Sequence, residues 1–273
     1  MRNACARSGS VVADGLLRVQ QRTLPAPSRS SCVPGAGFAE PGNTMSIDLA
    51  IAPTLLGRRP DGSLGNKADR FRTRVAARLS LGLRTELVRY GLCRNLAIPI
   101  RQPLGEIPIS VRPLQEGDLA SIFPYDHTLD ADEKKEIAWR LAFVEKGARR
   151  GFVAIDKRNG VPCHVQWLFG PDENAFIERL KGFPALETHQ ALIENVYTSP
   201  AYRRRGIMST AMAMIAECAA EQGAREVLTF IPHDNIASLK GAQRSGFRPA
   251  LLHRSVRIGF GLIRTDTFEK FPV

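Results

Sequence analysis

The sequence predicts an α/β domain, specifically a mixed central sheet flanked by helices, preceded by a basic helical N-terminal extension. Three observations predict this fold class. Strand and helix patterns alternate from residue 108 onward. The 273 residues, of which 44% are hydrophobic, suffice for a full core. Positive charge is uneven, because residues 1–110 hold 16 Lys and Arg against 7 Asp and Glu, whereas residues 111–273 hold 22 against 20.

The N-terminal part is expected to lie outside the domain. Residues 1–44 are rich in Ala, Ser, Arg, Gly and Pro without an apolar period, and residues 1–66 are predicted to form a disordered or extended segment. Residues 67–107 are interpreted as a basic amphipathic helix, Lys67 to Leu92, and a connector, because apolar residues recur every four positions from Phe71 to Leu87. Such a segment fits contact with nucleic acid or an anionic membrane, and equally a solvated arm or packing against the domain.

Residues 108–273 are expected to form the folded domain. Period-two patterns predict strands at 107–113, 151–156, 161–169, 191–199 and 225–231, with two closing strands within 247–268. Helical periods and start signals predict helices at 115–123, 132–146, 205–221 and 235–245. The order of these elements predicts one sheet with helices packed on its faces.

Composition excludes several other classes of protein. No apolar stretch approaches the roughly 20 residues that span a bilayer, so a membrane helix or a secretory signal is not predicted. The five cysteines are scattered and never in Cys-x-x-Cys spacing, which argues against a disulfide framework and a zinc site. We therefore expect a cytoplasmic protein that needs no metal.

The most informative stretch runs from Ile193 to Met208, because a strand passes through an arginine loop containing Gly206 into a helix. A helix start exposes about four unpaired backbone N–H groups and carries roughly half a positive charge, so an anion can bind there. Gly206 has no Cβ and therefore allows a phosphate to approach the backbone. This layout predicts a phosphate-binding loop.

The Arg203 to Met208 loop resembles motif A of the GNAT superfamily of acyl-CoA N-acyltransferases, Arg/Gln-x-x-Gly-x-Gly/Ala; Arg203 and Gly206 fit, and Met208 departs. A second stretch, from Asn235 to Phe247, is similar to motif B of the same family, Asn-x-x-Ala/Ser and a helix ending in Gly-Phe. The resemblance covers about residues 108–262. Local roles are compatible with it, namely Asn235 as an N-cap, Gly246 at the helix C-terminus and Phe247 in the core.

The resemblance implies acetyl-CoA, or another acyl-CoA, as co-substrate. Backbone N–H groups of the loop would bind its pyrophosphate, and the edge of the strand at Val196 to Thr198 would pair with the pantetheine amides and polarise the thioester carbonyl. The implied cofactor-binding residues are Val196, Tyr197, Thr198, Arg203, Arg204, Arg205, Gly206, Ile207, Met208, Asn235 and Ser238.

Glu194 is the candidate catalytic residue. A protonated amine with a pKa near 10.4 must lose its proton before attack, at a cost of about 4.6 kcal/mol at pH 7, so a base or a water chain is expected. Several family members carry a glutamate at the equivalent place, and a period of two puts Glu194, Val196 and Thr198 on one face of the strand. The alternative is a carboxylate that pairs with a surface arginine.

No general acid is assigned. The family's tyrosine, seven residues after the motif B asparagine, is replaced by Ala242, which cannot donate a proton. Tyr197, Ser238 and Gln243 are alternative donors. The acidic residues near the first helices would attract a cationic amine or serve as helix caps; they are Asp126, Asp130, Asp132, Glu133 and Glu136. His127 and His164 are expected in the core or on the surface.

The sequence thus favours an acyl-CoA-dependent N-acyltransferase that moves an acetyl group to a primary amine by direct attack in a ternary complex. The acceptor is expected to be a small molecule rather than a protein. One alternative is a non-catalytic acyl-CoA-binding module whose basic N-terminal region contacts a membrane or nucleic acid. Another keeps the fold and changes the acyl donor to acyl carrier protein or aminoacyl-tRNA.

Overall fold

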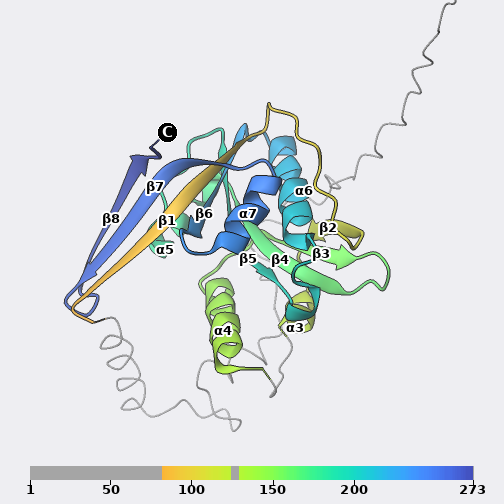
Figure 1. Ribbon diagram of the computed structural model, residues 1–273, viewed down its shortest axis with the longest axis horizontal. Coiled ribbons are helices and arrows are strands. Elements are labelled where there is room, and N and C mark those ends of the chain that lie inside the picture. The colour runs from red at the N-terminus through yellow and green to blue at the C-terminus, as the bar shows by residue number, and fades with distance from the viewer. Residues whose placement is uncertain (1–81, 124–128, 273) are drawn as a thin grey trace, which may run out of the picture. The chain divides into compact units, whose positions relative to one another are not determined.

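A computed structural model describes residues 82–123 and 129–272 of the chain. They form an eight-stranded sheet in the order β2-β3-β4-β5-β6-β1-β7-β8 (Figure 1). Neighbouring strands are antiparallel except β5 and β6, which are parallel. This mixed sheet flanked by helices confirms the predicted fold class.

The elements from residue 107 onward follow the sequence prediction closely. The strands are β1 (Arg84–Asn95), β2 (Ile109–Pro113), β3 (Gly151–Asp156), β4 (Pro162–Phe169), β5 (Gln190–Thr198), β6 (Glu226–Pro232), β7 (Arg248–Ile258) and β8 (Ile263–Lys270). The helices are α3 (Asp118–Ile122), α4 (Ala131–Glu145), α5 (Asn174–Leu180), α6 (Ile207–Glu221) and α7 (Ile236–Arg244), with short 3-10 turns at Pro171–Glu173 and Pro200–Tyr202. Of these, the sequence did not predict β1 or α5.

The helix predicted from Lys67 to Leu92 is wrong over its described part. Residues 84–95 form β1, which is hydrogen-bonded to β6 on one side and to β7 on the other. A spacing of four residues fits a helix, but four is also a multiple of the strand period of two, so Leu83 and Leu87 satisfy both patterns. Both side chains are exposed. The folded unit therefore begins before residue 108, while residues 1–81, including the predicted disordered segment, lie outside the described residues.

Two helical layers cover opposite faces of the sheet (Figure 1). Helices α6 and α7 pack on one face through residues such as Met212, Ile215 and Leu239. Helices α3, α4 and α5 pack on the other face, where Trp167 and Phe169 of β4 lie at the centre of the cluster. We call these the α6 face and the α4 face.

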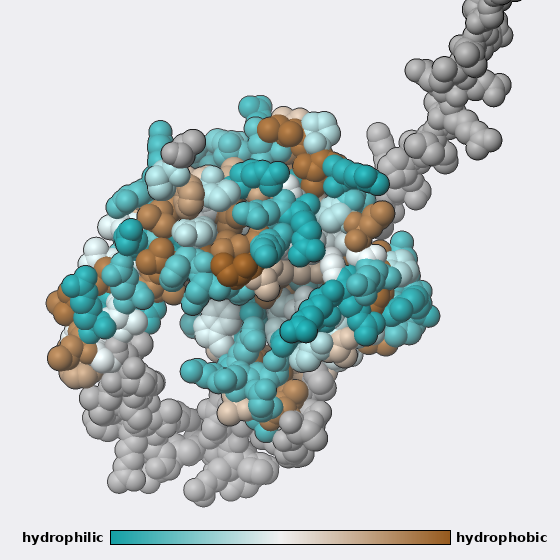
Figure 2. Space-filling view, in the orientation of Figure 1, coloured by the Kyte–Doolittle hydropathy of each residue, from teal (hydrophilic) through white to brown (hydrophobic). Residues whose placement is uncertain are grey.

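The β1, β7 and β8 strands extend beyond the helical layers and end in a tip at the β7–β8 turn (Figure 1). The tip exposes apolar side chains, which form the brown group at the end of this hairpin in Figure 2; they are Leu83, Ile258, Leu262 and Ile263. Within residues 82–123 and 129–272, no helix is long and apolar enough to cross a membrane.

Candidate active site

The parallel strands β5 and β6 diverge at the centre of the sheet. Their paired residues run only from Gln190 with Glu226 to Leu192 with Leu228. Beyond that point, the Glu194 carboxylate lies between the strands, because its Oε1 accepts a hydrogen bond from the Phe230 backbone N–H at 3.0 Å. A side chain thus replaces the ladder where the strands separate.

A bulge in β5 changes which side chains share a face. Val165 pairs with Tyr197 and Trp167 with Glu194, so three steps along β5 match two along β4. Asn195 is the extra residue, with a φ of 56°, a left-handed conformation that asparagine tolerates better than most residues.

The prediction that Glu194, Val196 and Thr198 share a face is therefore wrong. Glu194 lies with Tyr197 on the α4 face, whereas Val196 packs against the α6-face core. Thr198 pairs with His164, whose side chain points to the α6 face together with that of Ala154. The bulge interrupts the period of two on which the prediction depended.

The protonation of Glu194 is set by opposing influences. Burial raises the pKa of its carboxyl above the ordinary value, and the positive charge of Arg89 opposes this most strongly. The N–H groups of Phe230 and Asn195 and the charge of Arg140 also favour the carboxylate, but the pKa stays raised. A carboxylate with a raised pKa is a better proton acceptor than an exposed one.

The Arg203–Met208 loop, called here the cofactor loop, connects the 3-10 turn after β5 to α6. Arg204 and Gly206 both have positive φ, 64° and 74°, which turns the backbone sharply before the helix. The first helical bond of α6 is donated by the Thr210 N–H to the Gly206 carbonyl, so the N–H groups just before Thr210 have no intrahelical acceptor. These groups are the ones an anion would bind.

Gly206 approaches another segment of the chain closely. A Cβ at Gly206 would lie 3.0 Å from the Cα of Gly105. The Glu106 N–H also donates to the Arg205 carbonyl, and the Thr210 hydroxyl donates to the Pro103 carbonyl. The absence of a side chain at Gly206 thus serves packing against residues 103–106, a contact that sequence reasoning did not foresee.

The other residues of the cofactor loop point in different directions. Arg204 and Arg205 are exposed, and Ile207 is buried. Met208 packs against the α6-face core, close to Gly241 of α7. The departure at Met208 from the family pattern is therefore accommodated by packing between α6 and α7.

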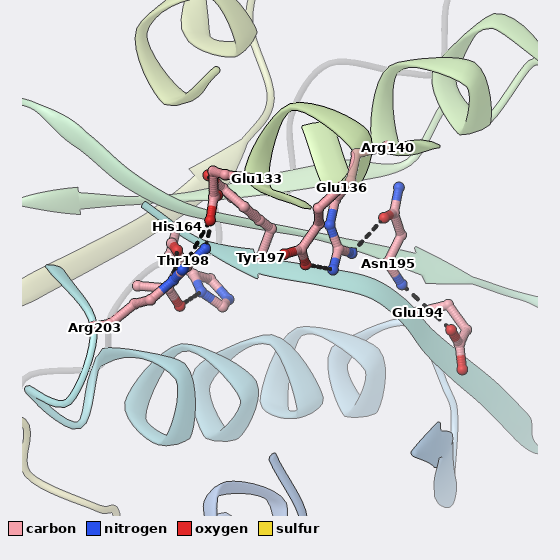
Figure 3. A network of polar contacts seen from close by, with 9 residues as sticks. All are labelled: Glu133, Glu136, Arg140, His164, Glu194, Asn195, Tyr197, Thr198 and Arg203. Atoms are coloured by element: carbon pink, nitrogen blue, oxygen red, sulfur yellow. Dashed lines mark hydrogen bonds and ion pairs between the residues drawn. The ribbon is translucent and has the colours of Figure 1, made fainter. Parts of the chain in front are cut away.

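Arg203 connects the cofactor loop to α4 (Figure 3). Its guanidinium binds both carboxylate oxygens of Glu133, at 3.0 and 2.9 Å, and its Nε donates to the Thr198 carbonyl at 3.1 Å. The Tyr197 hydroxyl donates to the same Glu133 at 2.6 Å. Arg203 and the Thr198 carbonyl are thus engaged with each other rather than directed at a cofactor.

Tyr197 is a poor proton donor in this setting. Burial and the neighbouring Glu133 carboxylate raise the pKa of its phenol further above its ordinary value. Burial raises the pKa of Glu133 too, but the hydrogen bonds from Arg203 and Tyr197 outweigh this effect and lower it. The Tyr197 proton is therefore held firmly.

Thr198 lies at the end of a buried polar chain (Figure 3). His164 Nδ1 is 2.8 Å from the Thr198 hydroxyl, and Nε2 is 3.2 Å from the Gln166 amide oxygen. Because an amide oxygen can only accept, the ring proton is assigned to Nε2, and Nδ1 accepts from the threonine. Burial lowers the pKa of His164 to about 4, so this histidine is a neutral core residue at pH 7.

The motif B residues have the local roles expected of them. The Asn235 side chain caps α7 by accepting the Ser238 N–H at 3.1 Å, and Gly246 follows the helix with a φ of 88°. Phe247 is buried in the core. Ala242 is also fully buried, packed among α6-face residues, so a tyrosine ring would not fit there without rearrangement.

Three of the acidic residues near the first helices, Asp130, Glu133 and Glu136, have partners within the protein. Asp130 is the N-cap of α4 and accepts the Glu133 N–H at 2.7 Å. Glu136 forms an ion pair with Arg140, whose guanidinium also donates to the Asn195 amide oxygen at 2.6 Å (Figure 3). Asp126 and His127 lie outside the described residues. Within the part of the chain that the structure describes, no cluster of three or more His, Cys, Asp and Glu side chains is arranged to hold a metal ion.

Sequence reasoning missed a second polar group beside Glu194. It consists of Arg89 from β1, His253 from β7 and Asp266 from β8, which contact one another on the α4 face. No motif marked these residues, because they are far apart in sequence and Arg89 was placed in a helix. Only the pairing of β1 with β7 and of β7 with β8 brings them together.

The fold is a mixed sheet whose parallel strands β5 and β6 diverge beside the start of α6, and this arrangement indicates the fold class of the domain. Residues 119–247 match the model of the Acetyltransferase (GNAT) family, so this part of the chain is a GNAT domain. No curated protein matches the chain significantly. The family match confirms the resemblance inferred from the two sequence motifs.

Several solved structures are similar in fold. A GNAT-family acetyltransferase from Colwellia psychrerythraea shares 14% identity, covering 68% of this chain and 57% of its own, with a TM-score of 0.40. A GCN5-related N-acetyltransferase from Sphaerobacter thermophilus shares 13%, covering 70% and 56%, with a TM-score of 0.41. A Brucella melitensis GNAT acetyltransferase solved with acetyl-CoA shares 16%, covering 45% and 75%, with a TM-score of 0.30. The chain spans less than two thirds of the length of the first two.

Proposed function

We propose that the protein is an acyl-CoA-dependent N-acyltransferase that transfers an acetyl group from acetyl-CoA to a primary amine in a ternary complex. One observation carries the proposal: in a GNAT domain, the Glu194 carboxylate lies where β5 and β6 diverge, in the strand that leads to the cofactor loop. A proton acceptor and an anion-binding helix start are thus parts of one strand-loop-helix unit. The acceptor is proposed to be a small molecule.

The proposed reaction is a direct attack. Glu194 takes a proton from the ammonium form of the acceptor, directly or through one water, and the neutral nitrogen attacks the thioester carbonyl carbon. The C–N bond forms and the C–S bond breaks; the nitrogen gives its second proton to solvent water, and CoA leaves as a thiolate that takes up a proton from solvent. Backbone N–H groups of the free edge of β5 would stabilise the oxyanion, and those of the cofactor loop would bind the pyrophosphate.

A non-catalytic acyl-CoA-binding module is the second candidate, and one observation favours it. The position of the family's tyrosine holds the buried Ala242, and the phenol of Tyr197, on the opposite face of the sheet, is bound to Glu133. Departure of the thiolate would then depend on solvent. A transferase that uses acyl carrier protein or aminoacyl-tRNA as donor is the third candidate.

The test is to incubate the full chain with acetyl-CoA and a panel of primary amines, while following free thiol and the mass of each amine. We expect equal amounts of free CoA and N-acetylated amine. Calorimetric binding of acetyl-CoA without product would instead identify a binding module. Absence of both binding and product would contradict acyl-CoA as the donor.

A further inference from the structure

Strands β1, β7 and β8 place charged side chains beside Glu194, and all three lie outside the segment that matches the family model. Residues 84–95 of β1 precede the matched segment, and β7 and β8 follow it. Arg89 is paired with His253 in the sheet, and His253 is paired with Phe268. The three strands therefore present Arg89, His253 and Asp266 on the same face.

The contacts among these residues fix their orientation. Arg89 Nε donates to His253 Nδ1 at 3.1 Å, and His253 Nε2 is 2.9 Å from Asp266 Oδ1. A guanidinium N–H can only donate, so Nδ1 is the acceptor and the ring proton is on Nε2, directed at the carboxylate. Arg264 Nε is 2.7 Å from the other carboxylate oxygen. We call Arg89, His253 and Asp266 the arginine-histidine-aspartate chain.

The arginine-histidine-aspartate chain contacts Phe230, whose backbone also binds Glu194. The Arg89 guanidinium lies over the rings of Phe183 and Phe230, 4.7 and 5.5 Å from their centroids. The backbone N–H of the same Phe230 is the donor to the Glu194 carboxylate. Arg89 also donates to the Gly182 carbonyl, so contacts with β6, with β7 and with the loop at residues 182–183 restrain its position.

The charges around Glu194 come from only a few described elements. Arg89 approaches from β1 and Arg140 from α4, and Arg89 exerts the larger attraction. Arg89 itself is surrounded by Glu194, His253, Arg264 and Asp266. A partly buried carboxylate loses its charge unless a cation is kept close, and a flexible arginine keeps its charge in place only when its guanidinium is held.

We propose that Arg89, aligned by His253 and Asp266, is a positioning residue that keeps the Glu194 carboxylate ionised and in place between β5 and β6. The proposal rests on the function proposed above, in which Glu194 accepts the proton of the amine. It assigns to β1, β7 and β8 a part in the reaction that neither sequence motif contains. His253 must be neutral to act, because its Nδ1 can accept from Arg89 only when it carries no proton.

The direct test is a titration of Glu194 in the full chain. Glutamate carboxyl carbons are labelled with ¹³C, and the Glu194 signal is assigned by its loss in Glu194→Gln. In Arg89→Met, the titration midpoint of this signal is expected to move to higher pH. The matched control is Arg254→Met, because Arg254 neighbours His253 in sequence but lies on the other face, paired with Glu86 at 3.1 Å. This control is expected to leave the midpoint unchanged.

The pH profile of acyl transfer is the second measurement. The rate of Arg89→Met at pH 6 is expected to fall by roughly tenfold or more, and the loss is expected to shrink toward pH 9, where Glu194 is ionised without help. His253→Leu is expected to cause a smaller shift in the same direction. His253→Gln is expected to restore part of the parent profile, because an amide oxygen can accept from Arg89.

Two outcomes would overturn the proposal. An unchanged titration midpoint of Glu194 in both Arg89→Met and His253→Leu would show that the arginine-histidine-aspartate chain does not act on the Glu194 carboxylate. A rate loss of the same size at every pH would show a structural role only. A parent protein that transfers no acyl group would contradict the proposed function. The titration of Glu194 needs no turnover, so it would still test whether Arg89 keeps the carboxylate ionised. If Arg89→Met does not fold, His253→Leu provides the same comparison.

Discussion

The cofactor loop lies within one short stretch of the sequence, whereas the arginine-histidine-aspartate chain collects side chains from three strands, and Arg89 is 164 residues from His253. The loop presents backbone N–H groups, and its shape follows from two residues with positive φ and a helix start. The second group presents side chains whose meeting depends on strand pairing. Local backbone chemistry leaves a signature in the sequence, and long-range side-chain chemistry does not.

The largest expected effect tests whether Glu194 serves the acceptor and not the cofactor. Glu194→Gln keeps the shape and removes the base, so turnover at pH 7 is expected to fall by about ten- to a thousandfold. The deficit is expected to shrink as the pH rises toward the pKa of the amine. Steady-state rates from pH 6 to 9 and calorimetric titration with acetyl-CoA would measure both. Parent-level turnover across this range would place the base elsewhere.

The next effect tests the cofactor loop. Gly206→Val adds a Cβ beside Gly105 and places a branched residue at a φ of 74°, so the loop must move. The affinity for acetyl-CoA is expected to fall at least about tenfold, because the backbone N–H groups lose their arrangement. Gly223→Val is the matched control, since Gly223 has a φ of 93° with open space around it and lies at the other end of α6. An equal loss of affinity in both variants would indicate general strain.

A third variant asks whether the family's tyrosine can be restored. Ala242→Tyr places a ring in a fully buried site and is expected to destabilise the fold by about 1–3 kcal/mol without raising the rate. Gln243→Tyr, at an exposed neighbouring position, is expected to change the free energy of unfolding little. Urea unfolding measures both. A faster Ala242→Tyr enzyme would show that this position faces the thioester.

The smallest effect is expected from the N-terminal residues without a core-forming pattern. Deleting residues 1–44 is expected to leave the melting temperature and the affinity for acetyl-CoA within error. Deletion through Leu92 removes most of β1 and exposes the edges of β6 and β7, so an insoluble product is expected. Thermal melting and soluble yield compare the two. A marked loss of melting temperature after the shorter deletion would mean that residues 1–44 pack on the domain.

Most of the fold from residue 107 onward followed from local patterns. Alternation and cap signals located β3, β4, β6, α6 and α7, and Asn235 and Gly246 have their expected roles. The prediction for residues 84–95 was wrong because a spacing of four residues fits both the helical period and the strand period of two. Pairing with β6 and β7 selects the strand. Glu194 was proposed as a site residue from family resemblance, but the face of the sheet predicted for it was wrong. The bulge at Asn195 interrupts the period of two, and no pattern in the sequence marks a bulge.

Strand β1 also determines when the sheet can be completed. Glu86 in β1 and Arg254 in β7, which form an ion pair, are 168 residues apart in the sequence. During synthesis β1 leaves the ribosome early, but both of its neighbours in the sheet are made later, so its two edges stay unpaired meanwhile. Such distant pairing slows folding. Of the strands in residues 82–123 and 129–272, the one made first is thus among the last to find its partners, and we expect refolding from denaturant to be limited by this distant pairing.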